Sequence, residues 1–321
     1  MKVKLLDLLF CPKCKGGFNL KNILFGNDDI KSGYLVCQEC KSEYPIINYI
    51  PRFVKDDGYV KSFSKEWNTY HNIQLDSVSG TKESENVFLK RTGFTSNYLK
   101  GKIVLDVGCG VGRFMEIAAK SSDYVVGVDM SYSVDRCWDN LKYLSNIDIV
   151  QADILNLPFK NSCFDAVFSI GVLHHTSNTQ ESFNKVSKLV KERGELAVWV
   201  YSNDGWKMAV YNAVASVYRF FTTKMKPDIL LELCYCAVPL YNVNRLPIIG
   251  KLTRILIPTS MESIAEWRIL DTFDWYSPRY QSKHTFEEVE SWFKECGFRD
   301  IKRLSKQYQN GDVSVYGIKT K

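Results

Sequence analysis

Short apolar runs and segments of helical spacing alternate along the middle of the chain. Four of these runs have the length of buried strands and lie at residues 103–107, 124–129, 147–150 and 164–170. Strands that alternate with helices indicate parallel βαβ units, so we predict a doubly wound α/β sheet. Near the C-terminus, an amphipathic helix at 286–296 precedes two strands at 298–305 and 312–320, which predicts a hairpin at the sheet edge.

A glycine-rich turn follows the first of these strands, in the sequence IVLDVGCGVGR. Gly108, Gly110 and Gly112 remove side chains from the turn, so a small ligand can approach the backbone there. The helix that begins near Gly112 presents unpaired N–H groups and a positive dipole end, which favours an anionic group. The spacing G-x-G-x-G differs from the G-x-G-x-x-G of nicotinamide-binding turns and disfavours dinucleotide binding. One such turn taken alone could also be a tight turn without a ligand.

Two more carboxylates follow the next strands along the chain. Asp129 ends the strand YVVGV, and its two oxygens could accept hydrogen bonds from both hydroxyls of a ribose. Asp153 follows the strand IDIV, and it could accept a hydrogen bond from an exocyclic adenine amine. Because the ends of parallel strands meet at one edge of a sheet, these residues predict a nucleoside site beside the glycine turn.

Four motifs in this order resemble those of the class I S-adenosylmethionine-dependent methyltransferases: LDVGCGVGR, VGVDMS, ADILNLPF and FDAVFSIGVLHHT. The resemblance covers residues 60–200, with a weaker match at 271–319. It implies a Rossmann-like, doubly wound sheet of seven strands, S-adenosylmethionine as cofactor, and methyltransferase activity. It also implies that the cofactor is contacted by Asp106, Gly108, Cys109, Gly110, Gly112, Asp129, Met130, Asp153, Ile154 and Ile170.

Two C-x-x-C pairs lie near the start of the chain, with 22 residues between them. Thiolates at such spacing can form two knuckles that hold one zinc ion and stabilise a segment too small to fold alone. A disulfide pair or a redox motif is the alternative, although redox C-x-x-C motifs usually occur singly. We therefore predict a Zn²⁺ site made by Cys11, Cys14, Cys37 and Cys40. The expected domains are a zinc ribbon at 1–58 and a methyltransferase domain at 59–321.

The ribbon segment resembles the small zinc-ribbon domain of tRNA methyltransferase activators and of some rRNA guanine methyltransferases, which raises an RNA hypothesis. The first sixty residues of the chain carry a net charge of only +2 and lack the clustered basic and aromatic side chains of an RNA-binding face. We therefore interpret the ribbon as a domain that packs on the core and shapes the substrate mouth. On this interpretation, nucleic acid is the less favoured partner.

An insertion follows the strand GELAVWVY, at residues 201–270. It contains three apolar segments of helical spacing mixed with basic residues, which predict an inserted helical lid. Such helices could enclose a substrate or lie in a membrane interface, so peripheral membrane contact through 206–258 is an alternative to a plain lid. No apolar run reaches the roughly 18 residues of a membrane span, and the first residues lack a signal-peptide cleavage site. We predict a cytoplasmic protein, with a membrane-peripheral location as the variant.

The candidate catalytic residues are histidines. His174 and His175 follow the strand FDAVFSI, beside the expected cofactor position, and either could remove a proton from an oxygen, nitrogen or activated carbon. The alternative is that they orient the loop or contact the cofactor. His284 is a secondary candidate.

Aromatic residues are the candidates for covering the cofactor and contacting the substrate. Trp67 and Tyr70 stand at i and i+3, so they share one face of a predicted helix. Tyr276 and Tyr280 belong to the segment 271–285, which is crowded with hydroxyl, imidazole and cationic groups. We expect this segment to lie at the mouth of the site and to contact substrate.

The chain has no N-P-P-Y-like stretch at the strand end where amino-methylating nucleic-acid enzymes commonly carry one. We therefore predict methyl transfer to the oxygen or carbon of a small-molecule, glycan or lipid-linked acceptor. The alternative enzyme is an rRNA or tRNA methyltransferase that uses the ribbon to contact RNA. A non-catalytic zinc-ribbon scaffold is a third interpretation, against which the intact Asp106, Gly108, Gly110 and Asp129 speak.

Overall fold

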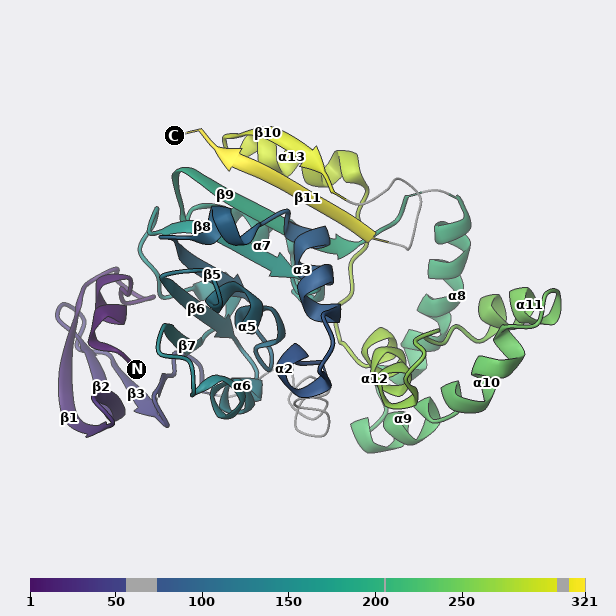
Figure 1. The fold of residues 1–321 in the computed structure, drawn as a ribbon, viewed down its shortest axis with the longest axis horizontal. Coiled ribbons are helices and arrows are strands. Elements are labelled where there is room, and N and C mark those ends of the chain that lie inside the picture. Colours follow the sequence, from purple (N-terminus) through teal and green to yellow (C-terminus); the bar gives the residue numbers. More distant parts are fainter. Residues whose placement is uncertain (56–73, 205, 305–311, 321) are drawn as a thin grey trace.

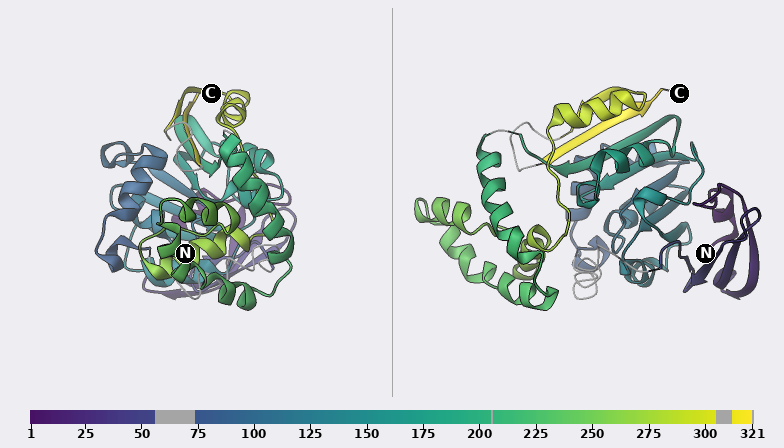
Figure 2. Two further views of the ribbon diagram at one scale, coloured as in Figure 1. Left: turned by 90° about the vertical axis from the view of Figure 1, so that its right-hand side faces the viewer. Right: turned by 180° about the vertical axis from the view of Figure 1, so that it is seen from behind.

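The computed structural model describes residues 1–55, 74–204, 206–304 and 312–320. Within these residues, a four-stranded sheet lies near the N-terminus and a seven-stranded sheet forms the centre (Figure 1). A group of helices lies at the other end of the central sheet from the four-stranded sheet (Figure 2).

The central sheet has the strand order β10-β11-β9-β8-β5-β6-β7. Its strands are β5 (Ile103–Val107), β6 (Tyr124–Asp129), β7 (Ile147–Gln151), β8 (Phe164–Ile170), β9 (Val190–Tyr201), β10 (Phe298–Arg303) and β11 (Asp312–Lys319). Strands β5 to β9 are parallel, whereas β11 pairs antiparallel with both β9 and β10. The central strands are buried on both faces, which explains their continuous apolar runs. The predicted seven-stranded, Rossmann-like sheet is confirmed.

Helices cover both faces of this sheet. They are α2 (Asp76–Ser79), α3 (Glu83–Thr92), α4 (Ser96–Leu99), α5 (Arg113–Ala119), α6 (Ser133–Leu141), α7 (Thr179–Ser187) and α13 (Phe286–Glu295). Alternate residues of β5 enter different hydrophobic clusters, because successive side chains of a strand point to opposite faces. Val104 packs with Phe88 of α3 and Met115 of α5, whereas Leu105 packs with Phe183 of α7 and Phe293 of α13. The sheet is therefore the middle layer of three.

The N-terminal sheet consists of β1 (Phe18–Gly26), β2 (Asp29–Cys37), β3 (Glu43–Ile47) and β4 (Ile50–Pro51), in that order. It does not have a separate core, because Leu9 and Leu35 share a hydrophobic cluster with Val126 of β6 and with Phe159. Backbone hydrogen bonds join Phe10 to residue 158 and residue 160 to residue 8. The expected boundary after residue 58 lies outside the described residues, so the two-domain division stays a prediction.

The insertion forms α8 (Trp206–Thr222), α9 (Pro227–Cys234), α10 (Ala237–Asn244), α11 (Ile249–Leu256) and α12 (Ala265–Tyr276). The predicted helical lid is thus confirmed, although α12 continues beyond residue 270. In Figure 1 these helices lie beyond the arrowheads of the parallel strands, with α12 nearest the sheet. Among the described helices, none combines the length and the apolar character needed to cross a membrane.

Candidate active site

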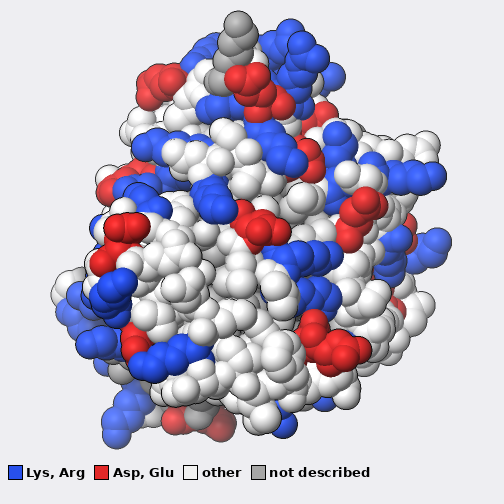
Figure 3. All heavy atoms as spheres, turned by 90° about the vertical axis from the view of Figure 1, so that its left-hand side faces the viewer, with Lys and Arg blue, Asp and Glu red and all other residues white. Residues whose placement is uncertain are grey.

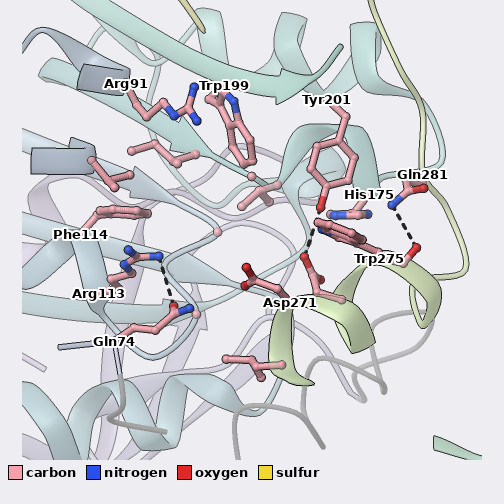
Figure 4. A pocket seen from close by; sticks show the side chains of 18 of the residues that line it. Gln74, Arg91, Arg113, Phe114, His175, Trp199, Tyr201, Asp271, Trp275 and Gln281 are labelled. Carbon is pink, nitrogen blue, oxygen red and sulfur yellow. Dashed lines mark hydrogen bonds between the residues drawn. The ribbon is translucent and has the colours of Figure 1, made fainter. Parts of the chain in front are cut away.

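A cavity of about 680 Å³ lies between the carboxyl ends of the parallel strands and α12 (Figure 4). Open α/β sheets bind their ligands at this edge, and the volume is that of a small-molecule site. Seven of the ten residues predicted to contact the cofactor line it: Gly108, Cys109, Gly110, Asp129, Met130, Ile154 and Ile170. Asp106, Gly112 and Asp153 do not line it. Binding by any of these ten residues stays a prediction.

Two glycines of the turn combine a positive φ with a close neighbour, and both features exclude a side chain. Gly108 has a φ of 82°, and a Cβ there would lie 2.3 Å from a methyl carbon of Val172. Gly112 has a φ of 93°, and a Cβ there would lie 2.5 Å from Leu141 of α6. Gly108 therefore allows Val172 to pack against the turn, and Gly112 allows α6 to pack against the start of α5.

Asp129 is held at the end of β6 by the backbone of two loops. Its Oδ2 accepts a hydrogen bond from the Gly110 N–H at 3.0 Å. Its Oδ1 accepts two from Ser131, from the N–H at 2.8 Å and from the hydroxyl at 2.7 Å. Burial raises the pKa of Asp129 above its usual value, and these hydrogen bonds offset only part of that rise. Because Oδ1 is already engaged twice, Oδ2 has the greater remaining capacity for a ligand hydroxyl.

The other two acidic candidates have different surroundings. Asp106 is buried behind the turn, and its Oδ2 has no hydrogen-bond partner among the described residues. Burial and the nearby Asp129 raise the pKa of Asp106. Asp153 caps the short helix η3 (Ile154–Asn156), where its carboxylate accepts a hydrogen bond from the Leu155 N–H at 3.0 Å. The structure therefore gives Asp153 a local role in the loop.

Of the three candidate histidines, only His175 lines the cavity. Its Nδ1 lies 3.0 Å from the carbonyl oxygen of Tyr280, and burial lowers its pKa to about 4. Because a carbonyl can only accept, Nδ1 carries the hydrogen of a neutral ring and Nε2 is the acceptor. His174 is fully buried with its ring 4.0 Å from that of Tyr201, and burial strongly lowers its pKa. His284 does not line the cavity, and its Nδ1 lies 3.0 Å from Glu288 Oε1.

The aromatic residues predicted to contact substrate also differ in whether they line the cavity. Tyr276 lines the cavity, and its hydroxyl donates a hydrogen bond to the Pro258 carbonyl at 2.7 Å. Tyr280 does not line the cavity and contacts His175 through its backbone carbonyl. Trp67 and Tyr70 lie outside the described residues. Of the two candidates that the structure describes, one, Tyr276, therefore lines the cavity.

Arg113 is a cavity residue that the sequence analysis missed. It is the first residue of α5, and its Nε donates a hydrogen bond to the Ser84 hydroxyl at 2.9 Å. A second donor reaches Gln74 Oε1 at 3.3 Å, and the guanidinium lies 5.1 Å from the Trp267 ring of α12 (Figure 4). Burial lowers the pKa of Arg113 to about 10, which leaves it cationic at neutral pH. The position of Arg113 directly after the glycine turn could have identified it as a cavity residue.

The lid supplies carboxylates to the cavity from α12. The side chains of Asp271 and Asp274 line it, and Asp274 Oδ2 accepts a hydrogen bond from the Tyr201 hydroxyl at 3.3 Å (Figure 4). Burial raises the pKa of Asp271 to about 7 and that of Asp274 to about 6. Trp275 and Lys283 also line the cavity. The segment 271–285 therefore lies at the site, as expected, although the sequence did not single out these members of it.

The four predicted metal ligands lie together at the opposite end of the molecule. All four sulfur atoms lie within 4.8 Å of one another, with Cys11 and Cys40 at 3.6 Å and Cys14 and Cys37 at 3.4 Å. Zn–S bonds of about 2.3 Å require S···S separations of about 3.8 Å in a tetrahedron, so these thiols fit a zinc site. The described part of the ribbon contributes no residue to the cavity.

Both the N-terminal and the central part of the chain match known protein families. Residues 105–198 match the model of a methyltransferase domain, and residues 2–48 match that of Trm112p-like proteins. The tRNA U34 carboxymethyltransferase of Desulfotalea psychrophila is 32% identical over 102 residues, which are 30% of this chain and 32% of that protein. The tRNA (carboxymethyluridine(34)-5-O)-methyltransferase of Saccharomyces cerevisiae is 30% identical over 114 residues, which are 35% of this chain and 39% of that protein.

Among solved structures, a Haloferax volcanii complex between the Trm112 methyltransferase activator and a methyltransferase aligns with a TM-score of 0.46. Its sequence is 12% identical, and the alignment covers 84% of this chain and 100% of that one. The chain spans less than half the length of the two curated relatives named above.

These relatives correct two of our predictions. Both are named for tRNA, and the ribbon matches Trm112p-like proteins. The expectation of a small-molecule, glycan or lipid-linked acceptor is therefore wrong, as is the ranking of such acceptors and of membrane contact above nucleic acid. The low ranking of nucleic acid came from the low net charge of the ribbon, and net charge does not report how individual cations are distributed over a surface. The choice of acceptor came from the missing N-P-P-Y-like stretch, which bears on the atom that is methylated and not on whether the acceptor is RNA. Residues 105–198 are therefore similar to a methyltransferase domain, and residues 2–48 are similar to Trm112p-like proteins.

Proposed function

We propose that the protein transfers a methyl group from S-adenosylmethionine to RNA, with the ribbon as a built-in Trm112p-like domain. The observation that carries this proposal is the presence in one chain of the methyltransferase domain and the Trm112p-like domain. The tRNA substrates named for the relatives support RNA as the acceptor. Residence in the cytoplasm, which the sequence predicts, is in keeping with such an acceptor.

The sheet side of the cavity suits the methyl donor. When bound, S-adenosylmethionine supplies an electrophilic methyl group on a positively charged sulfur. The bare backbone at Gly108 and Gly110 would admit the donor closely, and Asp129 would accept a hydrogen bond from a ribose hydroxyl. Ile154 and Ile170 would give the adenine apolar walls.

The opposite wall suits a planar acceptor. Tyr201, Trp275 and His175 line this side of the cavity, and Figure 4 shows them close to one another. Aromatic side chains bind unpaired bases by stacking, and an enzyme that modifies a base must take it out of its stack. We infer that one base enters between the lid and the strand ends, where exclusion of water favours transfer of the methyl group.

The ribbon would act at a distance from the reaction. We propose that its four cysteines hold one Zn²⁺, which would stabilise the two knuckles. Basic side chains on the ribbon end of the molecule are interspersed with acidic ones (Figure 3). RNA would therefore meet separate cations there, each paired with a phosphate, and the affinity would fall as salt rises.

The test is to identify what the protein methylates. Purified protein is incubated with methyl-labelled S-adenosylmethionine and, in separate reactions, with total tRNA, ribosomal RNA and a glycolipid extract. We expect label in one nucleoside after nuclease digestion of an RNA sample, and much less label with an Asp129→Ala variant. Label in the glycolipid fraction alone would refute the proposal. Absence of label from every fraction would favour the scaffold interpretation.

A further inference from the structure

Lys283 is a cation in the cavity for which the described residues provide no acidic partner. It lies between α12 and α13 and lines the cavity. The other lining cations are satisfied, because Arg91 pairs with Asp312, and Arg113 donates hydrogen bonds to Ser84 and Gln74. In the described part of the chain, no hydrogen bond or salt bridge to the Lys283 ammonium is found.

The charged group that acts on Lys283 is Arg219, which has the same sign. Burial, and then the charge of Arg219, lower the pKa of Lys283 to about 8. No carboxylate of the described residues offsets this lowering. Arg219 itself is occupied elsewhere, since its guanidinium donates to the carbonyls of Trp275 at 3.0 Å and Pro278 at 2.6 Å. Asp274 offsets the charge of Arg219 and is not among the groups that act on Lys283.

A partly buried ammonium without a counterion is costly, and an anion supplied by the ligand would remove that cost. Tyr201 and Trp275 line the same cavity and would hold a planar ring. We propose that Lys283 binds an oxyanion of the acceptor and thereby selects acceptors that carry one. The oxyanion is either a carboxylate on a modified base or a phosphate of the RNA backbone. This inference rests on the proposed function and specifies the chemistry of its substrate.

A carboxylate would also explain how transfer proceeds without a strong base. One carboxylate oxygen would contact Lys283, and the other would attack the donor methyl group with a lone pair. The new O–CH₃ bond forms as the S–CH₃ bond breaks, and its electron pair stays on sulfur, which becomes a neutral thioether. No proton leaves the acceptor, in keeping with the low pKa of His175. A backbone phosphate would instead position the RNA and take no part in bond making.

The first experiment needs no RNA. Protein saturated with S-adenosylhomocysteine is titrated with acetate and with inorganic phosphate, and the rise in unfolding temperature is measured. We expect Lys283→Gln to weaken anion binding by about tenfold or more, since a charge-assisted hydrogen bond is lost. Lys283→Arg should bind nearly as wild type. Lys294→Gln is the matched control, because Lys294 is exposed on α13 and pairs with Glu290. Equal anion binding by Lys283→Gln and wild type overturns the inference.

The second experiment separates the two sources of the oxyanion. An RNA hairpin carrying 5-carboxymethyluridine is compared with the same hairpin carrying the neutral amide and with the unmodified hairpin. Loss of binding to the first hairpin alone in Lys283→Gln identifies a carboxylate, whereas equal loss for all three identifies a phosphate. If wild type binds no RNA but the anion titration still depends on Lys283, the RNA proposal fails and the anion site stands. Unchanged binding in Lys283→Gln throughout refutes the site.

Discussion

The hydroxyl of Tyr201, the last residue of β9, donates a hydrogen bond to Asp274 of α12 across 3.3 Å. This contact joins the inserted lid to the edge of the sheet where the cavity opens. Arg219 of α8 strengthens the joint by donating hydrogen bonds to two carbonyls at the end of α12 and in the loop after it. Buried polar contacts therefore hold the lid over the cavity, and their protonation states affect its stability.

The carboxyls of Asp271 and Asp274 should make the protein less stable as pH rises from about 4 to about 7. Burial raises their pKa values to about 7 and about 6, above the usual 3.8. The folded state thus binds these protons more tightly, and this stability is lost as pH rises through the raised values. Asp271→Asn should flatten the decline in unfolding free energy, as measured by urea denaturation at pH 5 and pH 8. Asp228→Asn, at an exposed position on α9, should leave the slope as in wild type.

Asp129→Ala should weaken binding of S-adenosylmethionine by roughly 1.5–3 kcal/mol, the usual loss for a hydrogen bond to a charged group. The carboxylate also holds the Gly110 N–H, so the variant would loosen the turn as well as lose a ligand contact. Calorimetric titration measures the affinity. Asp139→Asn, at an exposed position on α6, is the control. Wild-type affinity in Asp129→Ala would show that the donor binds elsewhere.

Purified protein should contain close to one zinc ion per chain. Cys37→Ser should release it and lower the unfolding temperature, because metal binding and folding of the knuckles are coupled. Elemental analysis and thermal unfolding give the two readouts. Cys236→Ser, which alters an exposed thiol of the lid, should retain both the metal and the stability of wild type. A metal-free protein of unchanged stability would contradict the zinc proposal.

Arg52→Met should destabilise the junction between the ribbon and the sheet. The Arg52 guanidinium is buried, and it donates hydrogen bonds to Asp135 at 2.6 Å and Gln151 at 2.8 Å. Its removal leaves both acceptors without this partner, which should cost about 1–3 kcal/mol of unfolding free energy. Urea denaturation measures the loss. Lys21→Met removes an exposed ion pair with Glu43 inside the ribbon and should cost less than about 1 kcal/mol.

Much of the sheet edge beside the glycine turn was predictable because its requirements are local. Gly108 sits at a positive φ where a side chain would collide with Val172, and that need is expressed in the turn sequence itself. The position of Asp129 after a continuous apolar strand likewise indicates a strand end. The histidines were harder, because neighbours in sequence can have different surroundings. His174 is buried away from the cavity and His175 lines it, a difference set by the lid and strand ends that surround them.

The sequence by itself determined the order of strands and helices, the glycine turn, the pairing of cysteines into two knuckles and the existence of a helical insertion. Each of these depends on residues close together in the chain, whose spacing records the local geometry. Only the tertiary structure decided that Asp271, Asp274 and Lys283 line the cavity, and that the ribbon lies at the opposite end. Those placements depend on how α12 packs against strands distant in sequence, and no local pattern encodes that packing.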